Sequence, residues 1–376
     1  MLLPGHRPVP TKPDRDQAIR DVVFRIASRD TRLASVRYRA LIPACALQDA
    51  QYTTALCSDG APSAVHPRVA IGVKPLRAAD AAWVVRMRDR GVPTVVDICD
   101  NIFVEGYGGQ ASAVADGFRK TVRGGLVTVP TEALRAVVRD HTDVASERIM
   151  VVPDIVEDAT LLRRQACMLG ARAAPMQLSR GWNQMRPWAG RSMRALGMRG
   201  PVLLWFGNHG ANHANFGLDD LCLWEGALRD ASLLGAQLWV VSNHHERFRT
   251  IQRSLPISAR YFEWSPNRVD MLLALADVCL VPNSLDDFSR SKSPNRALKA
   301  LAAGVPVVAT PTPAMLALEG GAWLGDPAAG IRTYLEDRRV RDAHLAFARR
   351  RIEQDFSMDA LRQAMAAVMQ EALARG

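Results

Sequence analysis

Residues 277–310 read DVCLVPNSLDDFSRSKSPNRALKALAAGVPVVAT, and this stretch decides the fold. Residues 277–281 are a short apolar run, which predicts a buried strand. Residues 294–303 predict a helix that ends at Gly304, because glycine commonly follows the last helical turn. Residues 305–309 then predict a second strand. A strand, a helix and a strand in this order indicate a parallel α/β sheet.

The same alternation extends through the rest of the chain. In the second half we expect strands at residues 201–206, 236–242 and 259–264 and helices at 218–234, 268–275 and beyond 327, with Ser357 as the cap of a last helix over 358–375. In the first half we expect strands at 21–27, 69–73, 94–98, 125–129 and 149–152 and helices at 36–47, at 78–90 and after the capping residue Thr131.

Residues 157–200 interrupt this pattern with Gly, Pro, Arg and Trp in no clear period. The interruption predicts two doubly wound α/β domains, which agrees with a length of 376 residues. The expected divisions are a loose N-terminal arm (1–20), a first domain (21–156), a linker with an irregular helical excursion (157–200), a second domain (201–356) and a C-terminal helix (357–376).

Composition narrows the class of protein. Hydrophobic residues make up 48% and charged residues 23%, as in ordinary globular domains and unlike collagens or disordered chains. The longest apolar runs are far shorter than a membrane span, and because residues 1–20 are polar and proline-rich we expect no secretory signal there. Six cysteines without paired spacing indicate reduced thiols, and we therefore expect a cytoplasmic protein.

The net charge is +10, and only five of the 48 basic residues are lysine. The arginine bias has two readings: a GC-rich coding genome, or attraction to polyanions. Residues 159–218 contain eight arginines and no Asp or Glu. With Trp182 and Trp188, this segment could rest on an anionic membrane at the inner face, unless its arginines pair with carboxylates elsewhere. Nucleic acid is the less favoured partner.

Three candidate ligand sites follow strands of the second half, where parallel sheets bind their ligands. The third of them is the turn at residues 261–266 (YFEWSP). The loop at 207–215, GNHGANHAN, combines close backbone approach at Gly207 with neutral hydrogen-bonding groups such as Asn208. It could equally be a plain turn. A zinc site from His209 and His213 lacks an apparent third ligand, so we predict no metal.

The second candidate is the turn that begins the helix at 294–303. We expect Ser293 to cap this helix and Pro294 to open it. Lys292 and Arg296 then lie in the first turn, where the helix dipole disfavours positive charge. A bound anion would resolve this conflict, and the alternative is a solvated basic turn.

The motifs LKALAAGVPVVAT and DVCLVPNS resemble the nucleotide-sugar half of GT-B glycosyltransferases, especially the family-4-like group. TVVDICDN, VTVPTEALRAVV and IMVVPDIV resemble the N-terminal half of that fold, so the likeness covers roughly residues 22–375. It implies two Rossmann-like domains with an interdomain cleft, and a last helix that crosses back to the first domain. It also implies transfer of a sugar from a nucleotide diphosphate sugar to a hydroxyl acceptor, without metal or other cofactor, as in polysaccharide biosynthesis.

The family's two donor-site glutamates fall on Ser291 and Lys299 in this chain, so both acids are absent. The usual lysine after the first strand of the donor domain is missing as well. The resemblance therefore assigns the diphosphate to Lys292, Ser293, Asn295 and Arg296, while Lys299 faces the ribose or solvent. It assigns the nucleobase to Glu263 and Trp264, although the aromatic residues here could instead be core.

The first domain should hold the acceptor. The resemblance places Arg37, Tyr38 and Arg39 at its acceptor loop, where the two arginines could clamp an anion or simply lie on a helix face. Asp97 and Asp100 end a strand and are candidates for the general base or for helix capping. We include His209 with these two aspartates as a candidate catalytic residue.

The missing acids keep other functions open. The chain could be a catalytically impaired scaffold or partner of the same fold, a sugar-nucleotide epimerase, or a glycosyltransferase that modifies nucleic acid. The sugar, nucleotide, acceptor and stereochemistry are not specified by the sequence.

Overall fold

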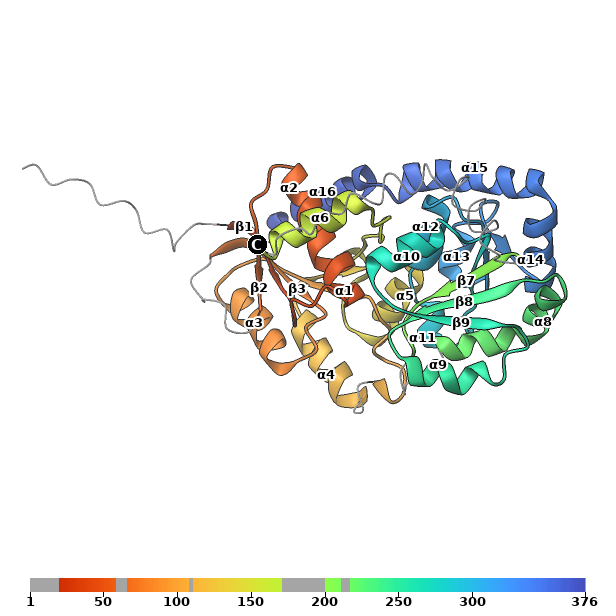
Figure 1. Cartoon of the computed structure of the whole chain (residues 1–376). Helices are drawn as coiled ribbons and strands as arrows, with labels where there is room; N and C mark the ends of the chain where they lie inside the picture. Colours follow the sequence, from red (N-terminus) through yellow and green to blue (C-terminus); the bar gives the residue numbers. More distant parts are fainter. Residues whose placement is uncertain (1–19, 59–65, 108–110, 171–199, 211–216, 376) are drawn as a thin grey trace, which may run out of the picture.

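The computed structural model describes residues 20–58, 66–107, 111–170, 200–210 and 217–375. These residues form two six-stranded sheets flanked by helices, one in each half of the chain (Figure 1). All neighbouring strands are parallel. The expected α/β architecture of two doubly wound domains is confirmed.

The first sheet has the strand order β2-β1-β3-β4-β5-β6. Its strands are β1 (Arg20–Arg25), β2 (Thr54–Cys57), β3 (Pro67–Val73), β4 (Thr94–Asp97), β5 (Leu126–Val129) and β6 (Ile149–Val151). The helices of this half are α1 (Ala34–Val36), α2 (Ile42–Asp49), α3 (Ala78–Asp89), α4 (Ala111–Val122), α5 (Glu132–His141) and α6 (Ala159–Met168).

The second sheet has the order β12-β11-β10-β7-β8-β9. Its strands are β7 (Val202–Phe206), β8 (Gln237–Ser242), β9 (Ala259–Glu263), β10 (Val278–Val281), β11 (Val307–Ala309) and β12 (Trp323–Leu324). The helices that follow them are α8 (Glu225–Leu233), α9 (His245–Gln252), α10 (Pro266–Leu273), α11 (Asp287–Arg290), α12 (Asn295–Ala302), α13 (Pro313–Leu316), α14 (Pro327–Glu336), α15 (Arg338–Asp355) and α16 (Met358–Arg375).

Burial explains why these segments are strands. Every residue of β4, β5, β7 and β10 is buried, as expected where helices cover both faces of a parallel sheet. Each sheet therefore separates two apolar cores, one on either face. The local signals expected at helix ends are also present: Thr131 accepts a hydrogen bond from the Leu134 amide, and Gly304 adopts a φ of +73°.

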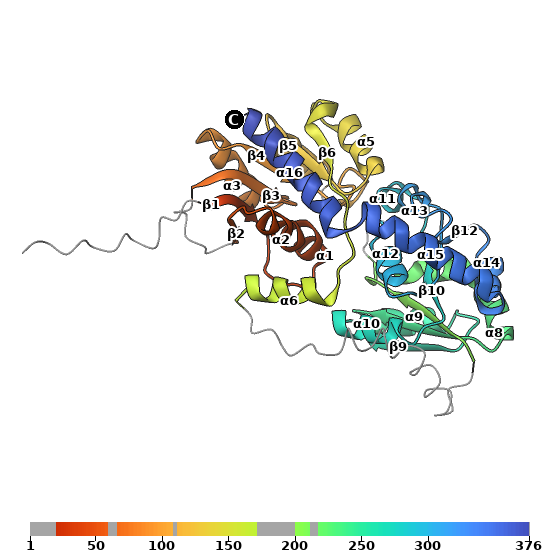
Figure 2. The ribbon, with the colours of Figure 1, turned by 90° about the horizontal axis from the view of Figure 1, so that it is seen from above.

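The C-terminal helices pass from the second domain to the first. Helix α15 runs along the second domain and α16 continues onto the first, where Leu361, Met365 and Val368 join the core beside α2 (Figure 2). Residues 152–158, between β6 and α6 of the first domain, lie beside this passage. The Val156 amide donates to the Phe356 carbonyl at 3.3 Å, and Val156 packs against the core of the second domain.

The structure differs from the expected elements in several places. Helices α4, α9, α11 and α13 were not expected. Strands β2 and β12 were not expected, because both are short, partly exposed edge strands with a weak apolar pattern. The helix expected at residues 36–47 begins at Ala34 and contains a π-helical turn at Arg37–Leu41. Residues 159–168 form a regular helix packed on the first domain through Leu161, instead of an irregular excursion. The rest of that expected excursion, 171–199, lies outside the described residues.

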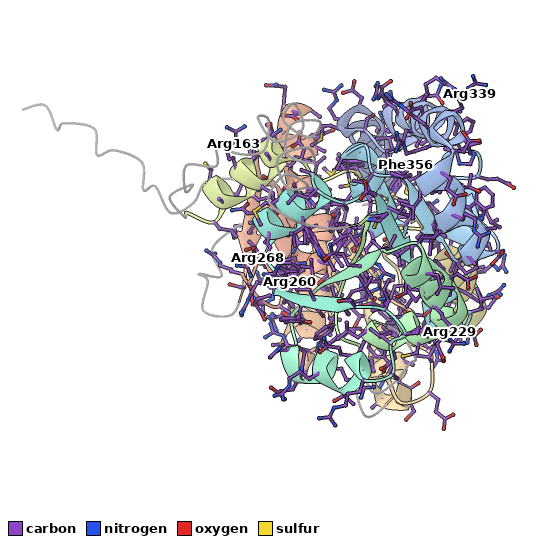
Figure 3. All side chains as sticks on the ribbon, turned by 45° about the vertical axis from the view of Figure 1, so that its right-hand side comes forward. Arg163, Arg229, Arg260, Arg268, Arg339 and Phe356 are labelled. Carbon is purple, nitrogen blue, oxygen red and sulfur yellow. The ribbon has the colours of Figure 1, made fainter. Side chains whose placement is uncertain are left out.

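In the part of the chain that the structure describes, no helix combines the length and apolar character that crossing a bilayer requires. The labelled arginines of Figure 3 belong to separate elements: Arg163 to α6, Arg229 to α8, Arg260 to β9, Arg268 to α10 and Arg339 to α15. Trp182 and Trp188, on which the expected membrane contact depends, are not among the described residues.

Candidate functional site

A cavity of about 830 Å³ lies between the two domains. The carboxyl ends of β7, β8, β9 and β10 open into it from one side, and the segment that follows β1 lines the other. This is the place where open parallel sheets bind ligands. Its polar lining consists mainly of Asp30, Arg32, Arg37, Tyr38, Glu157, Asn208, Asn243, Glu263, Asn283, Lys292, Ser293, Asn295, Arg296 and Lys299.

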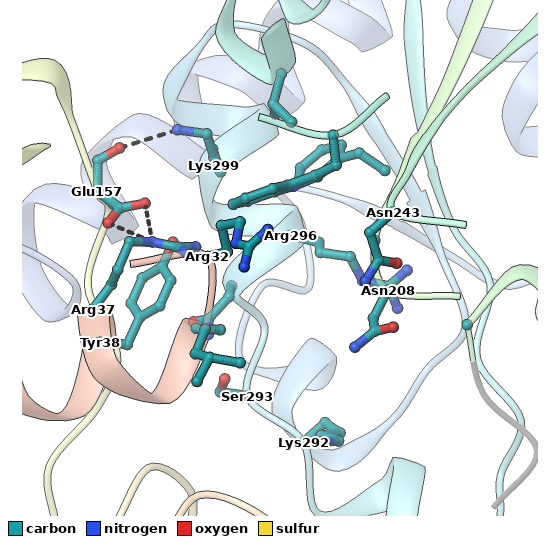
Figure 4. A pocket seen from close by; sticks show the side chains of 18 of the residues that line it. Arg32, Arg37, Tyr38, Glu157, Asn208, Asn243, Lys292, Ser293, Arg296 and Lys299 are labelled. Atoms are coloured by element: carbon teal, nitrogen blue, oxygen red, sulfur yellow. Dashed lines mark hydrogen bonds and ion pairs between the residues drawn. The ribbon is translucent and has the colours of Figure 1, made fainter. Parts of the chain in front are cut away.

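Arg296 extends from the first turn of α12 into this cavity (Figure 4). Its Nη2 donates to Oδ1 of Asn283 at 2.7 Å, and no carboxylate of the described residues lies within 4.0 Å of its guanidinium. Burial lowers the pKa of Arg296, and the charge of Asp220 partly opposes this. A guanidinium with spare N–H donors and no bound counter-charge is suited to hold an anion.

Gly207 lies against this guanidinium. A Cβ at position 207 would be 3.3 Å from Nη1 of Arg296 and 3.1 Å from the ring of Trp205. Glycine therefore lets the backbone after β7 approach Arg296 closely. Asn208, the next residue, lines the cavity as expected.

Lys292 also lines the cavity, but its ammonium group is paired across the domain interface. It binds Oδ1 of Asp100, while Lys74 binds Oδ2 of the same carboxylate. Burial alone would raise the pKa of Asp100, but the two ammonium groups hold it well below its usual range. Asp100 lies behind Lys292 and does not itself line the cavity. Lys292 thus has a carboxylate partner within the protein, which neither of the two expectations, a solvated turn or an anion site, included.

The start of α12 differs from the expected cap. The helix begins at Asn295 with Pro294 at the N-cap position, so neither Ser293 nor any other described side chain caps it. The Ser293 hydroxyl instead donates to Oδ2 of Asp154 at 2.7 Å. Nδ2 of Asn295 donates to the same oxygen at 2.8 Å. Both residues line the cavity and also tie α12 to the first domain.

Arg39 and Asp97 do not line the cavity, in contrast to the acceptor and catalytic roles expected of them. Arg39 is 2% exposed and donates to Asp97 at 2.7 Å, to Asp154 at 2.7 Å and to the Val152 carbonyl at 2.7 Å. Thr128 adds a further bond to Asp97. Burial would lower the pKa of Arg39, but Asp97 and Asp154 raise it instead. All of these groups are engaged inside the fold, so neither residue can reach an acceptor.

Arg37 and Tyr38 do line the cavity. Nε of Arg37 donates to both carboxylate oxygens of Glu157, at 2.9 and 3.1 Å, so its charge is largely matched. The Arg37 guanidinium also lies 5.3 Å from the ring centre of Trp264 in the other domain, a cation–π contact. Lys299, which lines the cavity near Glu157, is paired with Asp270 at 2.7 Å.

Glu263 and Trp264 occupy the cavity edge where β9 ends. Trp264 is half-buried, with one part against the second-domain core and another facing the cavity. Oε2 of Glu263 is bonded to the Tyr261 hydroxyl at 2.7 Å. Trp264 thus packs against the core and also lines the cavity, so a ligand contact at this position stays a prediction.

His209 is held at the rim of the cavity and is not part of its lining. Its backbone amide and Nδ1 both bond Oδ1 of Asn243, at 3.2 and 3.0 Å. His213, its partner in the zinc hypothesis, lies outside the described residues. Among the described residues, no three His, Cys, Asp or Glu side chains are gathered as a metal site requires.

Several residues of the site were not predicted from the sequence. Five of them line the cavity: Asp30, Arg32, Glu157, Asn243 and Asn283. Three more lie beside the cavity. Lys74 follows β3 directly, in a left-handed conformation with φ of +48°, and Asp154 follows β6. Their positions after predicted strands were an available signal. Asp220 is the third: its carboxylate accepts from the amides of Gly217 and Ser284 at 2.9 and 3.0 Å. Nothing in its helix-like surroundings distinguishes it from Asp219.

No protein-family model and no curated protein sequence matches this chain. Solved structures do match. HepE (Alr3699) of Anabaena, in complex with UDP and glucose, has a TM-score of 0.66 and 13% identity, covering 93% of this chain and 99% of that one. WaaG, a glycosyltransferase involved in lipopolysaccharide biosynthesis, has a TM-score of 0.62 and 16% identity, covering 92% and 99%.

The α,α-trehalose-phosphate synthase (UDP-forming) of Burkholderia vietnamiensis has a TM-score of 0.57 and 14% identity, covering 89% of this chain and 75% of that one. These likenesses extend over both domains. The chain therefore has the GT-B fold that the sequence motifs implied.

Proposed function

We propose that this protein is a glycosyltransferase that moves a sugar from a nucleotide diphosphate sugar to a hydroxyl acceptor between its domains. Arg296 carries the proposal: it is a cavity-lining guanidinium with no carboxylate of the described residues within 4.0 Å. The other cavity cations each have a carboxylate partner; they are Arg32, Arg37, Lys292 and Lys299. An anionic group of the donor is the natural counter-charge for Arg296.

The chemistry of the reaction supports this placement. When the sugar leaves, the nucleotide diphosphate gains negative charge, and a fixed guanidinium stabilises that charge without reorganisation. The hydrogen bond to Asn283 holds Arg296 in place, and Gly207, which has no side chain, leaves room for its guanidinium. HepE, of the same fold, was crystallised with UDP-glucose, so a uridine diphosphate sugar is the first donor to test.

The remaining parts of the cavity suggest how the substrates are arranged. Trp264, backed by Arg37, offers an aromatic face for the nucleobase. The acceptor would enter beside Asp30, Arg32 and Tyr38. Arg32 is bound to the Asp30 carboxylate at 2.8 Å, but 79% of its side chain is exposed, so we propose it, in place of the buried Arg39, as the arginine that faces an anionic acceptor.

We further propose that the transfer needs no metal ion. In the described lining of the cavity, the groups placed to balance a diphosphate are cations, while Asp286 caps α11 by accepting from the Ser289 amide at 2.7 Å. Ser291, where the family resemblance implies a glutamate, is 1% exposed and bonded to the Phe288 carbonyl.

Donor binding by an Arg296→Gln variant tests the proposal. Loss of a charge-assisted contact should weaken UDP-glucose binding roughly 10- to 100-fold by isothermal titration calorimetry. Arg229→Gln is the matched control, since Arg229 is exposed on α8 and pairs with Glu225. If Arg296→Gln binds every nucleotide sugar tried as well as the parent does, the proposed phosphate site is wrong.

A second candidate is a protein that binds the nucleotide sugar without transferring it. The two candidate general bases, Asp97 and Asp100, favour this alternative: each is held in an ion pair, and neither lines the cavity. Release of UDP from UDP-glucose, with and without a panel of hydroxyl acceptors, separates the two candidates. Turnover above the Arg296→Gln background supports the transferase.

A further inference from the structure

Asp220 is a buried carboxylate that joins two loops of the second domain. It is 2% exposed, and it lies in the 3-10 turn Leu218–Trp224. One oxygen accepts the Gly217 amide at 2.9 Å, and the other accepts the Ser284 amide at 3.0 Å. These amides belong to the loop that follows β7 and to the loop that follows β10.

Both loops form part of the cavity. On the first, Gly217 packs against the backbone of Asn208: its φ is +96°, and a Cβ there would lie 2.6 Å from the Asn208 carbonyl oxygen. On the second, Asn283 precedes Ser284 and bonds Arg296. Gly217, Asn208 and Asn283 all line the cavity. A single carboxylate thus sets the spacing of the two loops that surround Arg296.

The charge on Asp220 is not strongly compensated. Burial raises the pKa of Asp220 to about 6, the charge of Arg296 on α12 and the two amides lower it, and Asp286 raises it. Asp219, the acidic neighbour on the same turn, is paired with Arg247 at the surface. We therefore expect the protonation state of Asp220 to change between pH 5 and pH 7.

We propose that Asp220 is a positioning residue for the donor, whose carboxylate holds the two loops around Arg296 and whose protonation releases them. The inference rests on the proposed function, because the ligand affected is the nucleotide sugar. A carboxylate accepts strongly from both amides, whereas a protonated carboxyl keeps one carbonyl oxygen as a strong acceptor and has a hydroxyl oxygen that is a much weaker one and carries a proton of its own. Protonation therefore weakens the hydrogen bond to one of the two amides and with it the link between the loops.

The first measurement needs no ligand. Amide chemical shifts of Gly217 and Ser284 in the full-length protein are followed by NMR from pH 8 to pH 5. We expect both to move together with one midpoint near pH 6, and both to stay unchanged over this range in Asp220→Asn. Midpoints that differ, or no movement at all, overturn the inference.

The second measurement is UDP-glucose affinity over the same range, because its phosphodiester groups do not titrate there. If only the ionised form binds well, the apparent dissociation constant should rise about tenfold between pH 7.5 and pH 5. Asp220→Asn should bind weakly at both pH values, and Asp219→Asn should keep the parent profile. Equal parent affinity at pH 7.5 and pH 5 contradicts a positioning role.

The outcomes separate this inference from the proposed function. Absence of UDP-glucose binding by the parent at pH 7.5 refutes this choice of donor, and the inference fails with it. If the parent binds UDP-glucose with the same affinity at pH 7.5 and at pH 5, the proposed function is supported and the positioning role of Asp220 is refuted. If Asp220→Asn does not fold, the pH dependence of UDP-glucose affinity in the parent and in Asp219→Asn still tests the positioning role of Asp220.

Discussion

The ammonium group of Lys292 in the second domain binds the carboxylate of Asp100 in the first, 192 residues earlier in the chain. Lys74 binds the other oxygen of Asp100, so one buried carboxylate is shared by two cations. Phe288 covers Lys292 at 4.0 Å from its ring centre. This bridge fixes the α11–α12 turn, and with it the start of the helix that carries Arg296.

Replacing Asp100 by Asn should therefore destabilise the protein. An amide offers one acceptor oxygen, so one of the two ammonium groups is left facing an N–H group. Because both lysines are about one-third exposed, we expect a loss of roughly 1–3 kcal/mol of unfolding free energy, below the figure for a fully buried pair. Urea unfolding at pH 7 measures it.

The sign of the pH dependence follows from the lowered pKa of Asp100. Its contribution to stability is present above the unfolded-state value near 4 and is lost only as pH falls through the still lower folded-state value. The difference between parent and variant should thus be constant from pH 5 to pH 8. Asp116→Asn, which removes an exposed partner of Arg119, is the control and should change stability by less than about 0.5 kcal/mol.

Gly207→Ala should weaken donor binding without unfolding the domain. The added methyl group meets the Trp205 ring and Nη1 of Arg296, and the guanidinium is the easier of the two to displace. We expect UDP-glucose affinity to fall roughly tenfold, equivalent to about 1.4 kcal/mol. Gly226→Ala is the matched control: it lies within α8, where a Cβ meets nothing within 4 Å, so affinity should be unchanged and stability raised by up to about 1 kcal/mol.

Trp264→Leu should reduce nucleotide affinity more than stability. The substitution removes the aromatic face at the end of β9 and its cation–π contact with Arg37. We expect a loss of roughly 1–2 kcal/mol in binding of UDP and of UDP-glucose, measured by calorimetry. Phe262→Leu provides the comparison, because Phe262 packs on Trp239 at 5.4 Å and does not line the cavity. An affinity loss in Phe262→Leu as large as in Trp264→Leu would argue against a nucleobase contact at Trp264.

Chelation of divalent metal should leave donor binding unchanged. Arg296 and Lys292 already supply positive charge at the end of the cavity proposed for the diphosphate. UDP-glucose titrations in EDTA and in Mn²⁺ should give dissociation constants within a factor of two of each other. Loss of binding in EDTA that Mn²⁺ restores would instead implicate Asp286 and Asp287 as metal ligands.

Much of the fold could be read from local patterns. Continuous apolar runs such as residues 202–206 and 278–281 predict strands buried on both faces, and the helices between them predict parallel pairing. That topology places the carboxyl ends of β7, β9 and β10 at one edge, so Gly207, Trp264 and Arg296 were expected near each other and do line one cavity. The weakly patterned edge strands β2 and β12 were not recognised.

The sequence by itself determined the two doubly wound domains and the region of the ligand site, because hydrophobic period and helix-end residues are local properties. The tertiary structure alone decided which charges are paired. Arg39 looked as available as Arg37, yet it is bound by Asp97 and Asp154, 58 and 115 residues away. Such partners are chosen by the distances between side chains in the folded chain, and local pattern carries no information about those distances. For the same reason, only the folded chain shows that Lys292 is paired with a carboxylate while Arg296, among the described residues, is not, and that Asp220 joins two loops.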